Sequence, residues 1–325
     1  MSEIIIDPVT GKKTVIFDNE HKYGLDEPCQ ICEGLSIEDL LKKKELTYSE
    51  YSNGKLVAAS FPFDRPPFKL ENEHGTRPVH NIYDIQEMYG VSERLIVFGD
   101  PDDILSSKRM LKIYQSRDQS LAGNEKIRYV SIFKEYKKDK SSKTHIHSVL
   151  HAMSCVPSAV QDNLKGAEER YHSTTRCIYC DIAREEICNS KEFIISKNDD
   201  FMAYVPHESK VPYEVRILPL PKNHCEDFGK TSDSKISSLA EILHPILKLF
   251  RNMCDDNNKK FELYLYDSPK NSDSDIHPKM PESWHWHFGI SSNINEVFYK
   301  GIGVYVKTKS REAIAKEFRE ILQAA

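Results

Sequence analysis

Short runs of apolar and β-branched residues, many of them alternating with polar residues, recur along the chain and predict strands. The expected strands cover residues 94–98, 129–133, 193–195, 214–220, 261–266, 283–290 and 303–307. Helical spacing is rarer. It marks residues 236–250, where Pro245 is expected to kink or break the helix, and residues 314–322, with Ser310 as the N-cap. A shorter helix is expected at 37–41, capped by Ser36. Strands without regular β-α-β alternation predict an α+β fold with mainly antiparallel sheets and few helices.

Length and composition are typical of a folded chain with two domains. The chain has 325 residues, of which 39% are apolar or aromatic and 29% are charged, and this balance excludes a disordered protein. The net charge of −5 argues against nucleic acid as a partner. No apolar run approaches the roughly 20 residues that span a bilayer, and the first residues lack the features of a signal peptide. We therefore expect a cytoplasmic protein without a membrane partner.

Two kinds of motif occur twice and in the same order. A Cys-x-x-Cys pair is followed, at nearly equal distances, by a His-x-His pair, which predicts that one structural plan has been duplicated. We expect one domain at 1–170 and a second at 171–325, with the boundary in the polar stretch 165–175. The motifs are, in chain order, Cys29/Cys32, His145/His147, Cys177/Cys180 and His285/His287.

Each Cys-x-x-Cys turn offers two thiolates, which is half of a tetrahedral zinc site, and histidine is the commonest source of the other ligands. In the second half, His224 and His285 are the natural partners of Cys177 and Cys180. The alternative is a reduced turn that binds no metal.

In the first half, His145 is expected to join Cys29 and Cys32. The fourth ligand stays open between an aspartate that follows the 94–98 strand, Asp102 or Asp103, and a histidine, His80. We expect about two zinc ions per chain, because thiolate ligands favour zinc.

For the second histidine of each His-x-His pair, we predict a role other than metal binding. Residues i and i+2 of a strand point to the same face, so a ligand histidine holds its neighbour beside the metal site. His147 is then placed to attack phosphorus as a nucleophile, and the small Ser148 leaves room for a phosphate. The alternatives for His147 are a metal ligand or a core histidine. His287 stands between Trp286 and Phe288, which favours a packing role.

Several motifs resemble the galactose-1-phosphate uridylyltransferase family, including its ADP-glucose phosphorylase branch, within the histidine-triad superfamily. They are spread over nearly the whole chain. In order, they are Asp-Pro-Val-Thr-Gly at 7–11, Cys-Gln-Ile-Cys at 29–32, Thr-His-Ile-His-Ser at 144–148, Cys-Ile-Tyr-Cys at 177–180, Pro-Tyr-Glu at 212–214, Pro-Leu-Pro-Lys-Asn-His at 219–224, His-Trp-His at 285–287 and Gly-Ile-Gly-Val-Tyr-Val at 301–306.

The resemblance implies duplicated histidine-triad-like halves and a ping-pong nucleotidyltransferase reaction. His147 would become the nucleotidylated histidine, His145 a ligand of the first zinc ion, and His224 and His285 ligands of the second. The implied partners are a nucleotide sugar and a sugar 1-phosphate or phosphate. A homodimer is a further implication, although the sequence identifies no interface.

Two positions near the implied substrate site depart from the family pattern. Val149 stands where the family has a glutamine that hydrogen-bonds the phosphate, and Glu135 stands where it usually has an asparagine. These departures keep two alternatives open. One is phosphorolysis or hydrolysis of dinucleoside polyphosphates, and the other is a zinc-stabilised nucleotide-binding protein without catalysis.

Overall fold

The computed structural model describes residues 2–6, 13–17, 36–43, 45–63, 84–87, 89–137, 145–209, 211, 213–257, 259–271, 280–292, 297–299, 304–306 and 309–324. Among these residues, no helix combines the length and the apolar character needed to cross a bilayer. The elements surround one large sheet, and all strand pairings between the described residues are antiparallel. The mainly antiparallel α+β architecture is therefore confirmed.

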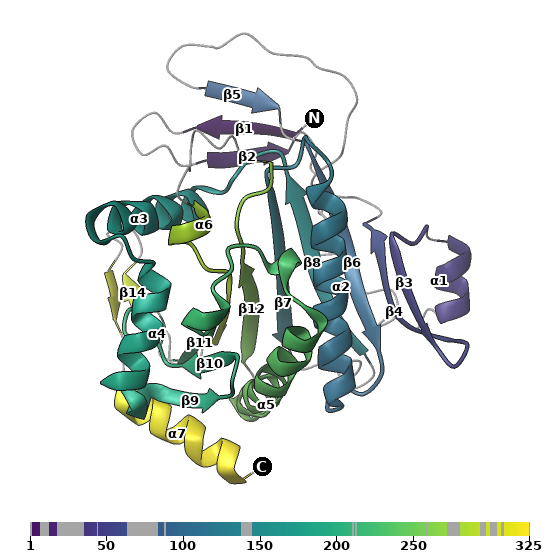
Figure 1. Cartoon of the computed structure of the whole chain (residues 1–325). Coiled ribbons are helices and arrows are strands. Elements are labelled where there is room, and N and C mark those ends of the chain that lie inside the picture. Colours follow the sequence, from purple (N-terminus) through teal and green to yellow (C-terminus); the bar gives the residue numbers. More distant parts are fainter. Residues whose placement is uncertain are drawn as a thin grey trace.

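Ten strands form this sheet (Figure 1). From one edge to the other they are β3 (Tyr48–Ser52), β4 (Lys55–Pro62), β6 (Gly90–Phe98), β8 (His145–Met153), β7 (Tyr129–Lys137), β12 (Lys260–Tyr266), β13 (His287–Ser292), β11 (Tyr213–Pro219), β10 (Phe201–Tyr204) and β9 (Ile194–Lys197). Two small sheets consist of β1 (Ser2–Ile6), β2 (Lys13–Phe17) and β5 (Asp84–Glu87), and of β14 (Val297–Tyr299) and β15 (Val304–Val306).

Seven α-helices lie in the described part of the chain. They are α1 (Ile37–Lys43), α2 (Ile104–Ala122), α3 (Ser158–Thr174), α4 (Ile178–Cys188), α5 (Asp233–Asn257), α6 (Met280–Ser283) and α7 (Arg311–Ala324). The caps expected for α1 and α7 are confirmed: the Asp39 amide donates to Ser36 Oγ at 3.1 Å, and the Ala313 amide donates to Ser310 Oγ at 3.2 Å.

The duplication predicted from the motifs is visible in the order of the strands. From its outer edge inward, the first half runs β3-β4-β6-β8-β7, and the second half runs β9-β10-β11-β13-β12. The helix α2 connects β6 to β7, as α5 connects β11 to β12. The strands β8 and β13, which carry or follow the His-x-His motifs, therefore occupy equivalent places. The two halves join where β7 pairs with β12, for example at Tyr136 and Phe261.

The boundary region differs from the expectation in one respect. The polar stretch 165–175 belongs to α3 and to the left-handed cap at Thr175, and no linker separates the halves there. Polarity at this place reflects the exposed side of a helix. The division into domains at 1–170 and 171–325 stays a prediction.

Of the kink or break expected at Pro245, the break does not occur, because α5 runs through this residue from Asp233 to Asn257. Proline removes one backbone donor and crowds the preceding turn. Burial offsets that cost here: Leu243, Ile246 and Phe250 are all fully buried in the main core. Packing energy of this kind commonly overrides local propensity.

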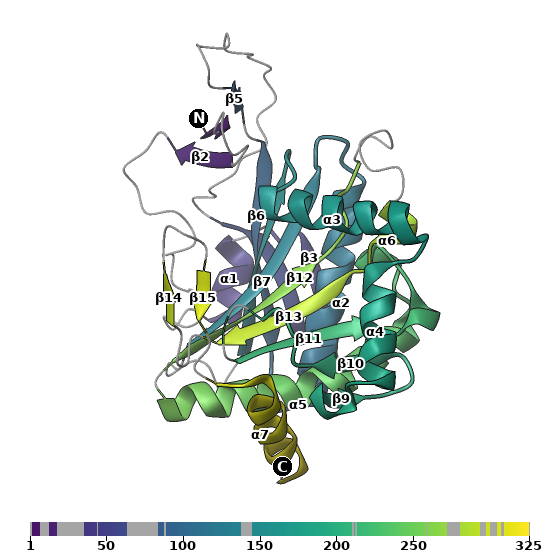
Figure 2. The same cartoon turned by 90° about the vertical axis from the view of Figure 1, so that its left-hand side faces the viewer.

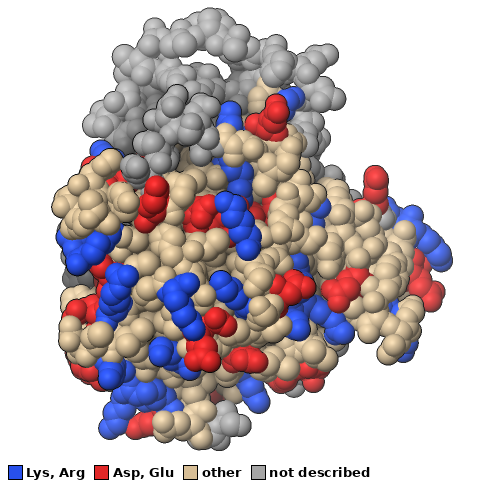
Figure 3. Space-filling model, in the orientation of Figure 1, with Lys and Arg blue, Asp and Glu red and all other residues tan. Residues whose placement is uncertain are grey.

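The two faces of the sheet have different surroundings. Leu95, Ile132, Ile146 and Leu263 point to the face covered by α2 and α5 and belong to the main hydrophobic core. The two helices lie side by side on this face (Figures 1 and 2). Acidic and basic side chains are interspersed on the outer surface seen from this side (Figure 3). Because strand side chains alternate, the neighbours of the core residues point to the opposite face of the sheet.

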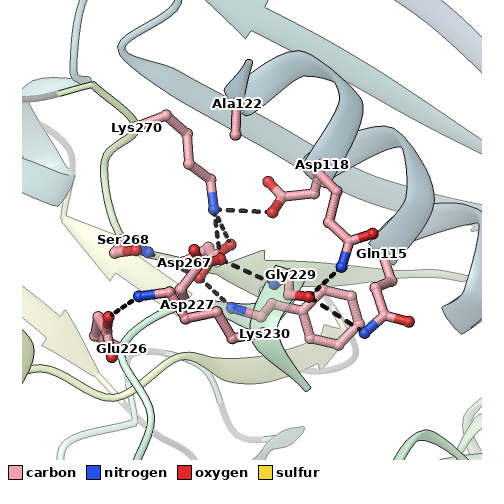
Figure 4. Close-up of polar contacts among 12 residues, drawn as sticks. Gln115, Asp118, Ala122, Glu226, Asp227, Gly229, Lys230, Asp267, Ser268 and Lys270 are labelled. Carbon is pink, nitrogen blue, oxygen red and sulfur yellow. Dashed lines mark hydrogen bonds and ion pairs between the residues drawn. The ribbon is translucent and has the colours of Figure 1, made fainter. Parts of the chain in front are cut away.

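A buried ion cluster ties the two halves together (Figure 4). The Lys270 ammonium donates to Asp118 of α2 at 2.8 Å, to Asp227 at 2.8 Å and to Asp267 at 2.9 Å. The side chains of Lys270, Asp118 and Asp267 are at most 3% exposed. Burial, together with the nearby Asp267 carboxylate, raises the pKa of Asp118 to about 8. The backbone at Gly229 passes so close that a Cβ there would lie 2.8 Å from Asp118 Oδ2.

The cluster gives the first prediction. Lys270→Met should lower the free energy of unfolding by about 3–5 kcal/mol, because it leaves buried carboxylates without their cation. Lys230→Met is the control, since Lys230 is 62% exposed and pairs with Glu226 at the surface. It should cost at most about 1 kcal/mol. Urea unfolding of the three proteins measures both effects. A loss below about 1 kcal/mol in Lys270→Met would show that the cluster does not stabilise the junction.

Candidate functional site

The strand β8 positions the first histidine pair. His147 lies opposite Ile96 and His145 opposite Phe98 in the ladder with β6, and both imidazoles point away from the α2 face. The ring centroids are 5.8 Å apart. His145 is only 4% exposed, whereas His147 is partly exposed. Lys134 Nζ donates to the His147 carbonyl at 3.3 Å, which helps to hold this stretch of β8. The arrangement thus presents one partly exposed imidazole beside a buried one.

Ser148 points in the opposite direction. Its hydroxyl lies 2.5 Å from the Tyr114 hydroxyl of α2, and the residue is 2% exposed. The expected contact between this side chain and substrate is not supported by its position, because the strand alternation that directs His147 to one face directs Ser148 to the other.

The other residues expected near His147 are only partly brought together. Val149 shares the His147 face and pairs across the strands with Phe133. Glu135 is exposed and forms an ion pair with Lys260 at 2.7 Å. Asp102 forms an ion pair with Arg251 at 2.5 Å, and its side chain is 59% exposed. Asp103, the other aspartate considered, is the N-cap of α2, where its carboxylate accepts from the Leu105 amide at 2.9 Å. Cys29 and Cys32, with the alternative ligand His80, lie outside the described residues.

The second metal group is assembled as the sequence predicted. Ligand atoms of Cys177, Cys180, His224 and His285 all lie within 4.8 Å of one another. Cys180 Sγ is 3.3 Å from His224 Nδ1 and 3.3 Å from His285 Nε2. Two sulfur and two nitrogen donors at such separations suit a tetrahedral ion. The pKa of the Cys177 thiol is lowered to about 5, mainly by its hydrogen bond with Cys180 and also by His224, so the set already favours a thiolate.

Outer contacts orient these ligands. His224 Nε2 lies 2.8 Å from the Pro281 carbonyl, so Nε2 carries the proton and the Nδ1 lone pair is directed at the thiolates. Pro281 belongs to α6, which no sequence pattern predicted. The structure also shortens the expected 283–290 strand, because α6 ends at Ser283 and β13 begins at His287. His285 is therefore held before the strand, fully buried.

His287 is more enclosed than His147, as expected. It is 4% exposed, and its ring stacks on Tyr266 with centroids 4.8 Å apart and planes 15° apart. Burial, with a smaller contribution from Arg216, lowers the pKa of His287 to about 3. Sequence reasoning missed one feature here: His287 lines a cavity of about 580 Å³ that α3 and α4 help to form. Neither helix was predicted, so no signal in the sequence indicated the cavity.

Solved structures define the class of the fold. A structure of uridylyltransferase superposes with a TM-score of 0.76 at 20% identity, and 99% of each chain is covered. A crystal structure of an ADP-glucose phosphorylase from Arabidopsis thaliana with bound ADP-glucose gives a TM-score of 0.70 at 20% identity, covering 98% of this chain and 99% of that one. The chain thus has the uridylyltransferase fold, with duplicated halves.

Sequence comparison narrows this class. The ADP-glucose phosphorylase from Arabidopsis thaliana is 26% identical over 251 residues, which are 71% of this chain and 67% of that protein. A galactose-1-phosphate uridylyltransferase from Thermotoga maritima is 20% identical over 215 residues, 64% of each chain. No protein-family model matches the chain. The resemblance to the galactose-1-phosphate uridylyltransferase family, in its ADP-glucose phosphorylase-like branch, is confirmed.

The second metal group gives a prediction about metal content. Cys177→Ser should remove about one metal equivalent per chain and lower the melting temperature, because a closed four-ligand site contributes binding energy directly to folding. Cys188→Ser is the matched control, since Cys188 is an exposed free thiol at the end of α4, the helix that Cys177 caps. Elemental analysis and thermal unfolding measure the two effects. Equal metal content in both variants would contradict the assignment of this site.

Proposed function

We propose that this protein is a nucleotidyltransferase that moves a nucleoside monophosphate through His147 between a nucleotide sugar and a sugar 1-phosphate or phosphate. The likeness to an ADP-glucose phosphorylase over 71% of the chain supports the reaction class. One observation supports the choice of residue. On β8, a buried His145 lies beside a partly exposed His147, while the equivalent pair near β13 is buried throughout.

The reaction has two displacements. An imidazole nitrogen of His147 attacks the α-phosphorus of the nucleotide sugar, a P–N bond forms, and the P–O bond to the leaving sugar 1-phosphate breaks. An oxygen of the second phosphate then attacks the same phosphorus, and the P–N bond breaks. The intermediate divides one difficult transfer into two easier ones. His147 is partly buried on a central strand of the sheet, which restricts its side chain. Less conformational entropy is therefore lost when the imidazole aligns with the phosphorus atom.

Zinc is the proposed metal at both sites. The second site would be Cys177, Cys180, His224 and His285, whose geometry fits a closed tetrahedral ion. The first would combine His145 with Cys29 and Cys32, with Asp102 as the proposed fourth ligand. For Asp102 to bind there, its ion pair with Arg251 must open. When bound, zinc supplies structural cross-links that hold the two halves in shape.

A cytoplasmic location is part of the proposal, and the described cysteines fit it. The described cysteines form no disulfide with one another, and thiolate metal sites persist where thiols are kept reduced. A homodimer, as the family resemblance implies, is part of the same proposal.

The role of His147 is tested by substitution. His147→Asn should lower kcat for nucleotidyl transfer by about 10³-fold or more, because asparagine cannot form the covalent intermediate. His172→Asn is the control, since His172 is an exposed histidine on α3. His287→Asn should reduce activity far less and mainly disturb packing with Tyr266. An active His147→Asn enzyme alongside an inactive His287→Asn enzyme would show that the catalytic residue lies in the other half.

A further inference from the structure

The cavity beside His287 lies on the face of the sheet opposite α2 and α5. Strands β11, β12 and β13 form its floor, and α3 and α4 contribute walls. Its volume of about 580 Å³ falls within the usual range for small-molecule sites. Because β13 is the counterpart of β8, the cavity occupies the place in the second half that the His147 face occupies in the first. The proposed reaction makes no use of it.

Aromatic rings form much of this lining. Tyr179 of α4 and Tyr264 and Tyr266 of β12 all line the cavity. Gly289 allows Tyr266 to lie close against β13, since a Cβ there would be 2.9 Å from Tyr266 Cε2. Tyr266 also stacks on His287. The result is a lining rich in aromatic rings, which suits a flat or ring-shaped ligand with apolar C–H groups.

The cavity is also lined by polar side chains that hydrogen bonds and ion pairs hold in place. His287 lines the cavity, and its Nδ1 lies 3.2 Å from the His285 carbonyl, so Nδ1 donates and the second ring nitrogen, Nε2, is an acceptor. Arg216 is held by ion pairs with Glu208 and with Glu214, the latter at 3.5 Å. Such carboxylates can accept hydrogen bonds from the neighbouring hydroxyls of a ligand, and the guanidinium beside them can donate to those hydroxyls.

Charge in the cavity opposes a phosphorylated ligand. Among the described lining residues, Arg216 is the sole basic side chain, and Asp162, Glu208 and Glu214 are acidic. Two of the three carboxylates already neutralise Arg216. A phosphate here would meet more negative than positive charge among the described lining residues, and like charges brought together are strongly disfavoured.

We propose that the C-terminal half binds a neutral, polyhydroxylated ring in this cavity, either a free hexose or the ribose of an unphosphorylated nucleoside. Ring faces would contact the tyrosines, and hydroxyls would bond to Glu208, Glu214, Arg216 and His287. The site is a second one, separate from His147, and it selects against the phosphate groups that the proposed catalytic site requires. Its ligand is bound and not transformed.

Gly166 of α3 provides a way to block the cavity. It lines the space, and nothing lies within 4 Å of a Cβ built there, so Gly166→Phe can fill the cavity without a clash at the backbone. Replacing a helical glycine should also favour α3. Lys165→Phe places the same ring one position away on the same helix, at an exposed residue outside the lining. The pair therefore separates filling of the cavity from the addition of an aromatic residue to α3.

The test is calorimetric titration of the full-length, metal-loaded protein with glucose, galactose, adenosine and uridine, and with glucose 1-phosphate and ADP. Carrying both α3 variants in a His147→Asn background keeps the transfer reaction out of the measurement. At least one neutral ligand should bind with a Kd on the order of a millimolar. Gly166→Phe should weaken that binding tenfold or more, and Lys165→Phe should leave it unchanged.

Titration with hexoses and with nucleosides distinguishes the two classes of ligand that could supply the ring. Binding of hexoses alone assigns the cavity to free sugars, and binding of nucleosides alone assigns it to the ribose. The proposal is overturned if no neutral ligand binds, or if its binding is the same in Gly166→Phe and Lys165→Phe. It is equally overturned if glucose 1-phosphate or ADP binds more tightly than its neutral counterpart and loses that binding in Gly166→Phe. None of these outcomes depends on whether His147 is catalytic.

Discussion

Alternation of side chains along the ten-stranded sheet determines which residues form the core and which residues face the candidate sites. On each central strand, one set of side chains packs against α2 and α5, and the other set faces away from them. His145 and His147 belong to the second set, whereas Ile146 and Ser148 belong to the first. A shift of one residue in the register of β8 would bury the candidate nucleophile in the core and expose the core residues instead. Packing of the core residues of β8 therefore also determines the direction in which the His147 side chain points.

Duplication supplies two versions of this arrangement, and they have diverged in charge and enclosure. Near β13, aromatic side chains surround His287 and carboxylates hold Arg216. On β8, His147 stays partly exposed. The Lys270 cluster spans the junction between the halves, so the two versions are held in one body. A rigid frame of this kind lets one half specialise in covalent chemistry while the other keeps a shape suited to a neutral ring.

Local patterns were enough to predict the parts of the structure that depend on spacing along the chain. Strand alternation predicted the shared face of His145 and His147, and donor chemistry predicted the group formed with Cys177. The helix α2 escaped prediction because its buried side includes polar residues such as Gln115 and Asp118, which weaken the apolar stripe. The cavity and the orientation of His224 escaped for another reason: they arise from contacts between segments far apart in sequence, which periodicity does not encode.

The central claim is that His147 carries the nucleotide during transfer, and direct detection of that intermediate tests it most closely. The full-length protein would be mixed with ADP-glucose labelled in the α-phosphate, quenched without acid, digested, and mapped for labelled peptides. The account predicts up to about one label per chain, labile to acid as expected for a P–N bond, on the peptide containing His147. Label on a different residue, or release of glucose 1-phosphate with no labelled protein at any time, would contradict it.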